Sequence, residues 1–188
     1  DRGYVNKLGH SIIDSIAINI GQSEIDNHDS EWINISHDLF ANKSHEKNYN
    51  KMIGNTTENK SFSKTHKNIE LFIPLDFWFC KSTSSTFPIC CIQKQTFQIQ
   101  IKLKNAIDCI NYRGSTPPSV LPSISDGYVL VDYIFLDNEE RNLFLTNDHE
   151  YLIEQVQEMT EIVSLSDSKI NLVFDKACKY LIWAVTLN

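Results

Sequence analysis

The sequence predicts an all-β fold, in which antiparallel strands form a sandwich and long polar loops join them. In several segments, apolar residues recur at every second position, which is the period of a half-buried strand. Two long polar segments, 42–68 and 105–127, separate these strands. Many strands joined by such loops favour an antiparallel sandwich over a fold of alternating strands and helices.

The first strands are predicted from alternating side chains. In residues 11–20, four isoleucines share one parity and the polar residues Ser11, Ser15 and Asn19 stand on the other, and residues 97–103 show the cleanest alternation. Residues 69–79 are apolar at every odd position, although Pro74 has no N–H group to donate to a ladder. The apolar positions are Ile12, Ile16, Ile18, Ile20, Ile69, Leu71, Ile73, Leu75, Phe77, Phe79, Phe97, Ile99, Ile101 and Leu103.

The strand signals later in the chain are less regular. Residues 128–136 are apolar on both parities, which predicts a strand covered on both faces. The segments 170–174 and 180–187 repeat the strand pattern near the end. The segment 149–159 fits an amphipathic helix and an edge strand equally well, so its pattern alone leaves both structures open.

Helical signals are few. Asp29 is a predicted N-cap for a short helix that contains Trp32, because a carboxylate there accepts from the free N–H groups of the first turn. Asp137 and Glu140 lie three residues apart and have the spacing of a capping box, although the box proper begins with Ser or Thr. A second short helix is therefore predicted after Asp137.

Composition and charge exclude several classes of protein. The chain of 188 residues has a net charge of −7, whereas a nucleic-acid partner requires a clustered positive field. The lysine-rich segment 42–68 is interpreted as a solvated surface loop. No apolar stretch is long enough to span a bilayer, and no signal peptide stands at this start. We therefore expect no direct nucleic-acid contact and no insertion into a membrane.

The cysteines indicate a reducing compartment. There are five, an odd number with no CxxC pair, so they do not form a disulfide framework; they are Cys80, Cys90, Cys91, Cys109 and Cys178. We also expect the chain to be truncated at both ends, because it opens on Asp1 and stops at Asn188 directly after the apolar run 181–185.

A metal site is not predicted. None of the six histidines belongs to an HxH or HExxH pair, and the adjacent Cys90 and Cys91 have poor spacing for zinc ligands. His28 with Asp26 and Asp29 is the nearest approach to a ligand cluster, and we interpret it as a turn before the helix.

Catalytic and cofactor-binding residues are not predicted either. The chain has no GxSxG nucleophile elbow and no glycine-rich phosphate loop. His149, Glu150 and Glu154 could form an acid–base set on one helix face, but we interpret them as part of a solvated acidic connector. The sequence thus predicts that the protein is not an enzyme.

An aromatic cluster suggests an alternative function. Phe77 and Phe79 lie on the apolar parity of their segment and are predicted to pack in the core, whereas Trp78 points the other way. Trp78 is then a contact between subunits or sheets; alternatively, Trp78, Trp32 or tyrosine residues form the platform of a carbohydrate-binding β-sandwich. Four sequons occur, but the cysteine pattern does not support secretion; they begin at Asn34, Asn42, Asn55 and Asn59.

Six blocks in order resemble one family, the major capsid proteins of nucleocytoplasmic large DNA viruses of the iridovirus and phycodnavirus type. The first block combines YVNKLGHSIID with a later Ile-Asn-Ile-Gly-Gln and Glu-Trp, and the third, LFIPLDFWFCKS, is similar to the family's Leu-Tyr-Ile-Pro-Leu-x-Phe-Trp-Phe segment. The blocks occupy 4–14 with 18–22 and 31–32, then 50–55, 71–82, 131–144, 149–157 and 170–183.

The resemblance implies a double jelly roll. On this mapping, residues 1–146 are a first jelly roll without its N-terminal strands, and residues 147–188 are the junction and the first strands of a second. The resemblance also favours a strand over a helix for 149–157.

The implied function is structural, with no catalytic, cofactor-binding or metal-binding residues. Proteins of this type form homotrimers with a pseudo-hexagonal outline, and these capsomers contact neighbouring capsomers and minor capsid proteins in an icosahedral shell. The implied location is the virion, with assembly in the host cytoplasm.

Overall fold

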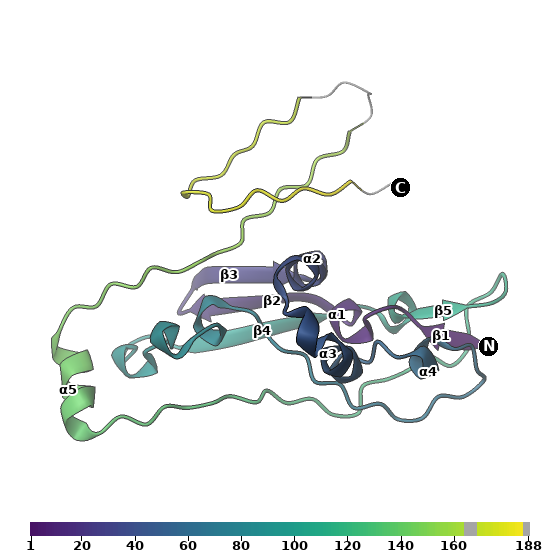
Figure 1. Ribbon diagram of the computed structural model, residues 1–188, viewed down its shortest axis with the longest axis horizontal. Coiled ribbons are helices and arrows are strands. Elements are labelled where there is room, and N and C mark those ends of the chain that lie inside the picture. Colours follow the sequence, from purple (N-terminus) through teal and green to yellow (C-terminus); the bar gives the residue numbers. More distant parts are fainter. Residues whose placement is uncertain (164–168, 186–188) are drawn as a thin grey trace. The chain divides into compact units, whose positions relative to one another are not determined.

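The computed structural model describes residues 1–163 and 169–185 (Figure 1). The chain divides into two compact units, Asp1–Gln155 and Val156–Asn188. The first unit contains all of the helices and strands assigned to the described residues.

A three-stranded antiparallel sheet with the order β3-β2-β4 forms the centre of the first unit (Figure 1). Its strands are β2 (Ile13–Ile20), β3 (Ser23–Asp29) and β4 (Phe97–Leu103). The strands predicted at 11–20 and 97–103 are confirmed. Strand β3 was not predicted, because most of its side chains are polar. A tight turn joins it to β2 through Gly21, whose φ of 61° favours glycine.

The register explains why β3 forms a strand although most of its side chains are polar. Ile16 lies opposite His28, and Ile18 lies opposite Asp26, so these two polar residues of β3 share a face with the isoleucines of β2. On the other side of β2, the same isoleucines pair with apolar residues of β4. This shared face is the buried one; its buried members are Ile16, Ile18, Asp26 and His28.

Aromatic side chains cover the buried face of the sheet. Phe77 and Trp78 are buried and pack with the isoleucines of β2, and Phe79, Phe87 and Phe97 surround them. Trp78 belongs to a 3₁₀ helix, Trp78–Cys80. The core of the unit is thus one sheet face and one aromatic layer.

The strand predicted at 69–79 is wrong as a hydrogen-bonded strand, but its parity is correct. The residues at odd positions are partly or fully buried, and those at 70, 72, 74 and 76 are exposed. No ladder forms along this segment. Pro74 lacks an N–H group, and the Phe72 N–H donates instead to the carbonyl oxygen of Met52, at the end of a helix.

Both predicted helices are confirmed, together with their caps. Helix α2 (Ser30–Phe40) begins after Asp29, whose Oδ1 accepts from the Trp32 N–H at 2.6 Å. Helix α5 (Asn138–Thr146) begins after Asp137, which accepts from the Glu140 N–H at 2.8 Å.

The polar segment 42–68 is not the continuous loop that the sequence predicted. It contains α3 (Glu46–Met52) and α4 (Thr57–Lys60), and both begin with acidic residues in the first turn, where the helix dipole favours them. The remaining elements are α1 (Leu8–Ser11) and the antiparallel pair of β1 (Arg2–Tyr4) and β5 (Ile110–Tyr112).

The predicted strand at 128–136 is wrong in this structure, as is the strand that the resemblance favoured at 149–157. Neither segment joins a ladder, and the same holds for 170–174 and for 180–185. Residues 186 and 187 of the last prediction lie outside the described residues. A strand needs a neighbour to pair its N–H and C=O groups, and the described residues provide none for these segments.

Candidate functional site

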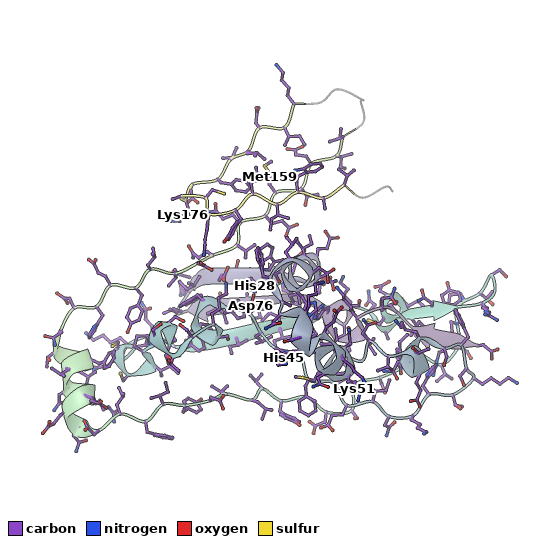
Figure 2. The ribbon with its side chains drawn as sticks, viewed as in Figure 1. His28, His45, Lys51, Asp76, Met159 and Lys176 are labelled. Carbon is purple, nitrogen blue, oxygen red and sulfur yellow. The ribbon has the colours of Figure 1, made fainter. Side chains whose placement is uncertain are left out.

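In the cluster that sequence reasoning chose as the nearest approach to a metal site, His28 and Asp26 form a buried polar pair in the core. His28 Nε2 lies 3.1 Å from Asp26 Oδ2, and their side chains are 6% and 1% exposed. The His28 ring, labelled in Figure 2, stacks on Phe77 with 4.3 Å between ring centroids. The prediction of a turn at this place is wrong, since both residues lie on the buried face of β3.

Asp29 does not join this pair. Its carboxylate caps α2, while Asp26 accepts from His28 and from the Asn27 N–H at 3.1 Å. No group of three or more His, Cys, Asp or Glu in the described part of the chain could hold a metal ion. The pair therefore satisfies two buried polar groups within the core, a structural task.

A second buried histidine, His10, lies where three helices meet. It has no exposed surface, its Nδ1 lies 2.8 Å from Asn34 Oδ1, and its Nε2 lies 2.8 Å from the Tyr49 hydroxyl. The neighbouring Gly9 allows close approach, because a Cβ there would stand 3.0 Å from the Cβ of Ile53. Sequence reasoning missed this site. The available signal was a histidine surrounded by the apolar residues of 8–13.

Burial changes the acid–base behaviour of this histidine site. It lowers the pKa of His10 below 6.5, and it raises the pKa of Tyr49 to about 12, with a further contribution from Asp76. At neutral pH the site thus holds an uncharged imidazole and an uncharged phenol.

The proposed acid–base set does not converge. His149 hydrogen-bonds through Nε2 to the Phe144 carbonyl oxygen at 3.1 Å, whereas Glu154 forms an ion pair with Lys81 at 2.9 Å. All three members, His149, Glu150 and Glu154, are exposed. This agrees with the interpretation of a solvated acidic connector.

The aromatic platform of the carbohydrate-binding alternative is absent at Trp78. This side chain is only 6% exposed and packs edge-on against Phe79, with 5.0 Å between ring centroids. The prediction that Trp78 points away from the core is therefore wrong. The backbone turns at the 3₁₀ helix Trp78–Cys80, so strict alternation of sides ends there.

Three of the four sequon asparagines are engaged inside the fold. Asn34 binds His10, Asn55 donates through Nδ2 to Asn50 at 2.7 Å, and Asn59 donates through Nδ2 to the Gly54 carbonyl oxygen at 3.0 Å. Asn42 is exposed and accepts from the Ser44 N–H.

Large apolar side chains are exposed along 120–135. Phe135 is 92% exposed and Leu130 73% exposed. The others in this segment are Val120, Leu121, Ile124, Tyr128, Val129, Val131, Tyr133 and Ile134. Contiguous apolar surface of this kind marks a site of interaction with another protein surface.

A family profile described as "Major capsid protein N-terminus" matches residues 1–137, which include the central sheet, the aromatic layer and the exposed apolar segment. The chain belongs to this family. Membership of the major capsid protein family confirms the resemblance found in the sequence, and the match extends over the greater part of the chain.

Relatives with the same description come from several large DNA viruses. The major capsid protein of Pyramimonas orientalis virus is 33% identical over 183 residues, which are 96% of this chain and 44% of the relative. Capsid protein 1 of Acanthamoeba polyphaga mimivirus is 30% identical over 201 residues, covering 98% of this chain and 33% of the relative. The chain thus spans less than half of the length of these curated relatives. They are capsid proteins, not enzymes, so the prediction of no enzymatic activity is confirmed at the level of the family.

A solved structure described as "PBCV-1 virus capsid, quasi-atomic model" has the same fold over much of the chain. The TM-score is 0.60 and the identity 25%, and the match covers 82% of this chain and 36% of that one. This similarity and the antiparallel sheets of the first unit agree on a β-rich capsid fold. No helix among the residues described by the structure is long and apolar enough to cross a membrane.

Proposed function

We propose that this chain is part of a major capsid protein that builds the icosahedral shell of a large DNA virus. In this proposal its residues belong to a double jelly roll, with a first jelly roll over 1–146 and the beginning of a second over 147–188. Three copies of the complete protein form a trimer whose six jelly rolls give a pseudo-hexagonal capsomer.

The exposed apolar segment 120–135 is the observation that carries the proposal. A chain that worked alone in water would leave this much apolar surface exposed at a cost of about 25 cal/mol for each Å² that it failed to bury. A capsid subunit covers such surface with the rest of its own fold and with neighbouring subunits. The segment also lies within the family match, so it is a property of the family region.

Tiling explains why this architecture suits a shell. Two similar sandwiches in each chain give a three-fold trimer a nearly six-fold outline, so trimers pack side by side and symmetric contacts close the shell. The partners are then other copies of the same protein, neighbouring capsomers and minor capsid proteins. The location is the virion capsid, with assembly in the host cytoplasm.

No residue is assigned a catalytic, cofactor-binding or metal-binding role in this proposal. The buried His28–Asp26 pair and the His10 site are enclosed by the fold, and His149 and Glu154 have separate partners. In the carbohydrate-binding alternative, Trp78 is buried and cannot form part of the platform, so that platform would have to consist of Trp32 or tyrosine residues.

The test is the oligomeric state of the full reading frame. Light scattering coupled to size exclusion is expected to give a stable trimer, and electron microscopy of the same fraction should give particles with a hexagonal outline. A monomer that binds sugars in a glycan screen would contradict the proposal.

A further inference from the structure

We propose that the junction of α1, α2 and α3 around His10 is an acid-sensitive latch. The latch consists of His10, Asn34, His37 and Tyr49. At neutral pH the latch holds α3 against α1 and α2, and it releases α3 when His10 takes up a proton. This is a property of the single chain and does not depend on the proposed role in a shell.

One imidazole ring joins the three helices. The amide oxygen of Asn34 only accepts, so His10 Nδ1 carries the proton and donates to it at 2.8 Å. His10 Nε2 is then the acceptor, and the Tyr49 hydroxyl donates to it, also at 2.8 Å. Both nitrogens of a ring with no exposed surface are therefore used, each by a different helix.

A second imidazole, that of His37, contacts both the phenol and the His10 ring. The His37 ring stacks on Tyr49 with 4.0 Å between centroids and an angle of 20°, and it meets His10 edge-on at 5.6 Å. Protons on both rings would place two cations side by side in a site with little access to water. Like charges at this separation repel each other more strongly in a buried site than at the surface.

Three other charged groups face the latch. Lys7 precedes α1 and adds a positive charge that opposes protonation of His10. Asp38 on α2 partly offsets it, because its Oδ1 lies 2.5 Å from Lys7 Nζ and 3.5 Å from His37 Nδ1. The charge of Asp76, which is labelled in Figure 2, adds to the larger effect of burial in raising the pKa of Tyr49.

The sign of the pH dependence follows from these contacts. Burial lowers the pKa of His10 most; the Asn34 hydrogen bond raises it, the charges of His37 and Lys7 lower it, and Asp38 raises it. In the open state, His10 titrates near its ordinary value of 6.5. The open state therefore binds more protons just below that pH, and the closed latch loses stability as the pH falls from about 6.5 toward the lower folded value.

Few other contacts hold α3. No side chain of α3 itself is buried, although Ile53 directly after it is. Two backbone bonds attach this end of the helix: Gly9 N–H donates to the Ile53 carbonyl oxygen at 2.7 Å, and Phe72 N–H to that of Met52 at 2.9 Å. The core of the central sheet contains none of these residues, so we expect local opening and not global unfolding.

Hydrogen–deuterium exchange on the full chain tests the latch. Between pH 7.5 and pH 5.5, after correction for the chemical exchange rate, exchange of residues 46–53 should rise by at most about tenfold in total, nearly all of it below pH 6.5, which is the limit for uptake of one proton in the open state. Exchange of residues 13–20 in β2 should stay constant. An unchanged rate at 46–53, or a parallel rise in both segments, overturns the proposal.

A matched pair of variants assigns the effect to His10. His10→Gln keeps a hydrogen-bonding side chain but takes up no proton, so the pH dependence at 46–53 should disappear. His45→Gln makes the same change at an exposed histidine next to α3 and should leave it intact (Figure 2). Persistence of the rise in His10→Gln rejects the latch.

A measurement on the unaltered chain tests the proposal even if the His10→Gln variant misfolds. In an NMR titration, the His10 ring signal should titrate below pH 6.5, whereas a midpoint at or above this value contradicts the proposal.

Discussion

Two regions of the first unit place their apolar side chains in opposite environments. In the core of the central sheet, Ile18 of β2 and Phe77 of the aromatic layer are buried almost completely. In 120–135, which is at least as apolar, Leu130 and Phe135 are largely exposed. The difference is the presence of a partner. Strand β2 has a hydrogen-bonded neighbour on each side and an aromatic layer on one face, whereas the described residues offer 128–136 no ladder.

The comparison shows that apolar pattern and burial are separate properties. Pattern determines which side chains benefit from leaving water, and burial also requires a complementary surface. Residues 128–136 are apolar on both parities, so they need a cover on two faces. Within the capsid proposal, the remainder of the protein and its neighbours supply this cover.

Removal of one aromatic ring from each region gives the largest expected contrast. Phe77→Ala should lower the free energy of unfolding by about 3–5 kcal/mol, because it deletes a buried ring and leaves a cavity. Phe135→Ala should change it by less than about 0.5 kcal/mol, as expected for an exposed side chain. Urea denaturation of the full chain, followed by tryptophan fluorescence, measures both. Equal losses would show that 128–136 is buried in the full chain.

Two pairs of polar side chains, one buried and one exposed, test the same difference between the core and the surface. Asp26→Asn removes the charge opposite His28 in the core and should cost about 3 kcal/mol, since the remaining polar group loses its partner in a site without water. Glu154→Gln alters the exposed pair with Lys81, whose side chains are 45% and 47% exposed, and should cost at most about 1 kcal/mol. The same denaturation experiment applies, and a cost below 1 kcal/mol for Asp26→Asn would contradict the buried role of the pair.

The sequence predicted the elements that depend on local chemistry. The alternating segments at 11–20 and 97–103 form strand β2 over 13–20 and strand β4, and the helices with a carboxylate cap, after Asp29 and Asp137, are both present. These features depend on residues a few positions apart, so a single sequence contains the whole signal.

Elements that depend on distant partners were not predictable in this way. Strand β3 looks polar, and its His28 and Asp26 are buried only because they pair with each other and lie beside isoleucines of β2. The His10 site joins three helices that are far apart in sequence. Trp78 has the outward parity of its segment but turns inward at a 3₁₀ helix. The family could be predicted because its blocks are patterns in the sequence itself, which can be recognised without knowledge of tertiary contacts.

The two helix caps test whether a helix is coupled to the core. Asp29→Ala should cost about 1 kcal/mol of global stability, because α2 packs on the core through Ile33. Asp137→Ala removes the same kind of bond from α5, which has no buried residue, so helix content should fall without a change in the unfolding midpoint. Circular dichroism with urea denaturation separates the outcomes. A global loss in Asp137→Ala would mean that α5 packs on the core in the full chain.

The smallest expected effect on the free energy of unfolding is that of Asp38, at the surface beside the latch. The hydrogen bond from Lys7 lowers the pKa of Asp38 below 3.8, so the stabilisation is complete well above pH 3.8 and is lost as the pH falls through the folded value. Because Asp38 is largely exposed, Asp38→Asn should cost only about 0.5 kcal/mol at pH 7 and low salt. One molar salt should remove most of this difference by screening.

Asp14→Asn is the matched control for this last substitution, because Asp14 is exposed on β2 and the same charge is removed there. Its effect should be smaller than that of Asp38→Asn at low salt, and the two should converge at high salt. Equal effects at both salt concentrations would show that net charge, and not the contact with Lys7, determines the stability. A larger effect of Asp38→Asn that survives high salt would mean that the ion pair with Lys7 is buried in the full chain. The surface of α2 around Asp38 would then resemble the buried central sheet and not the exposed segment 120–135.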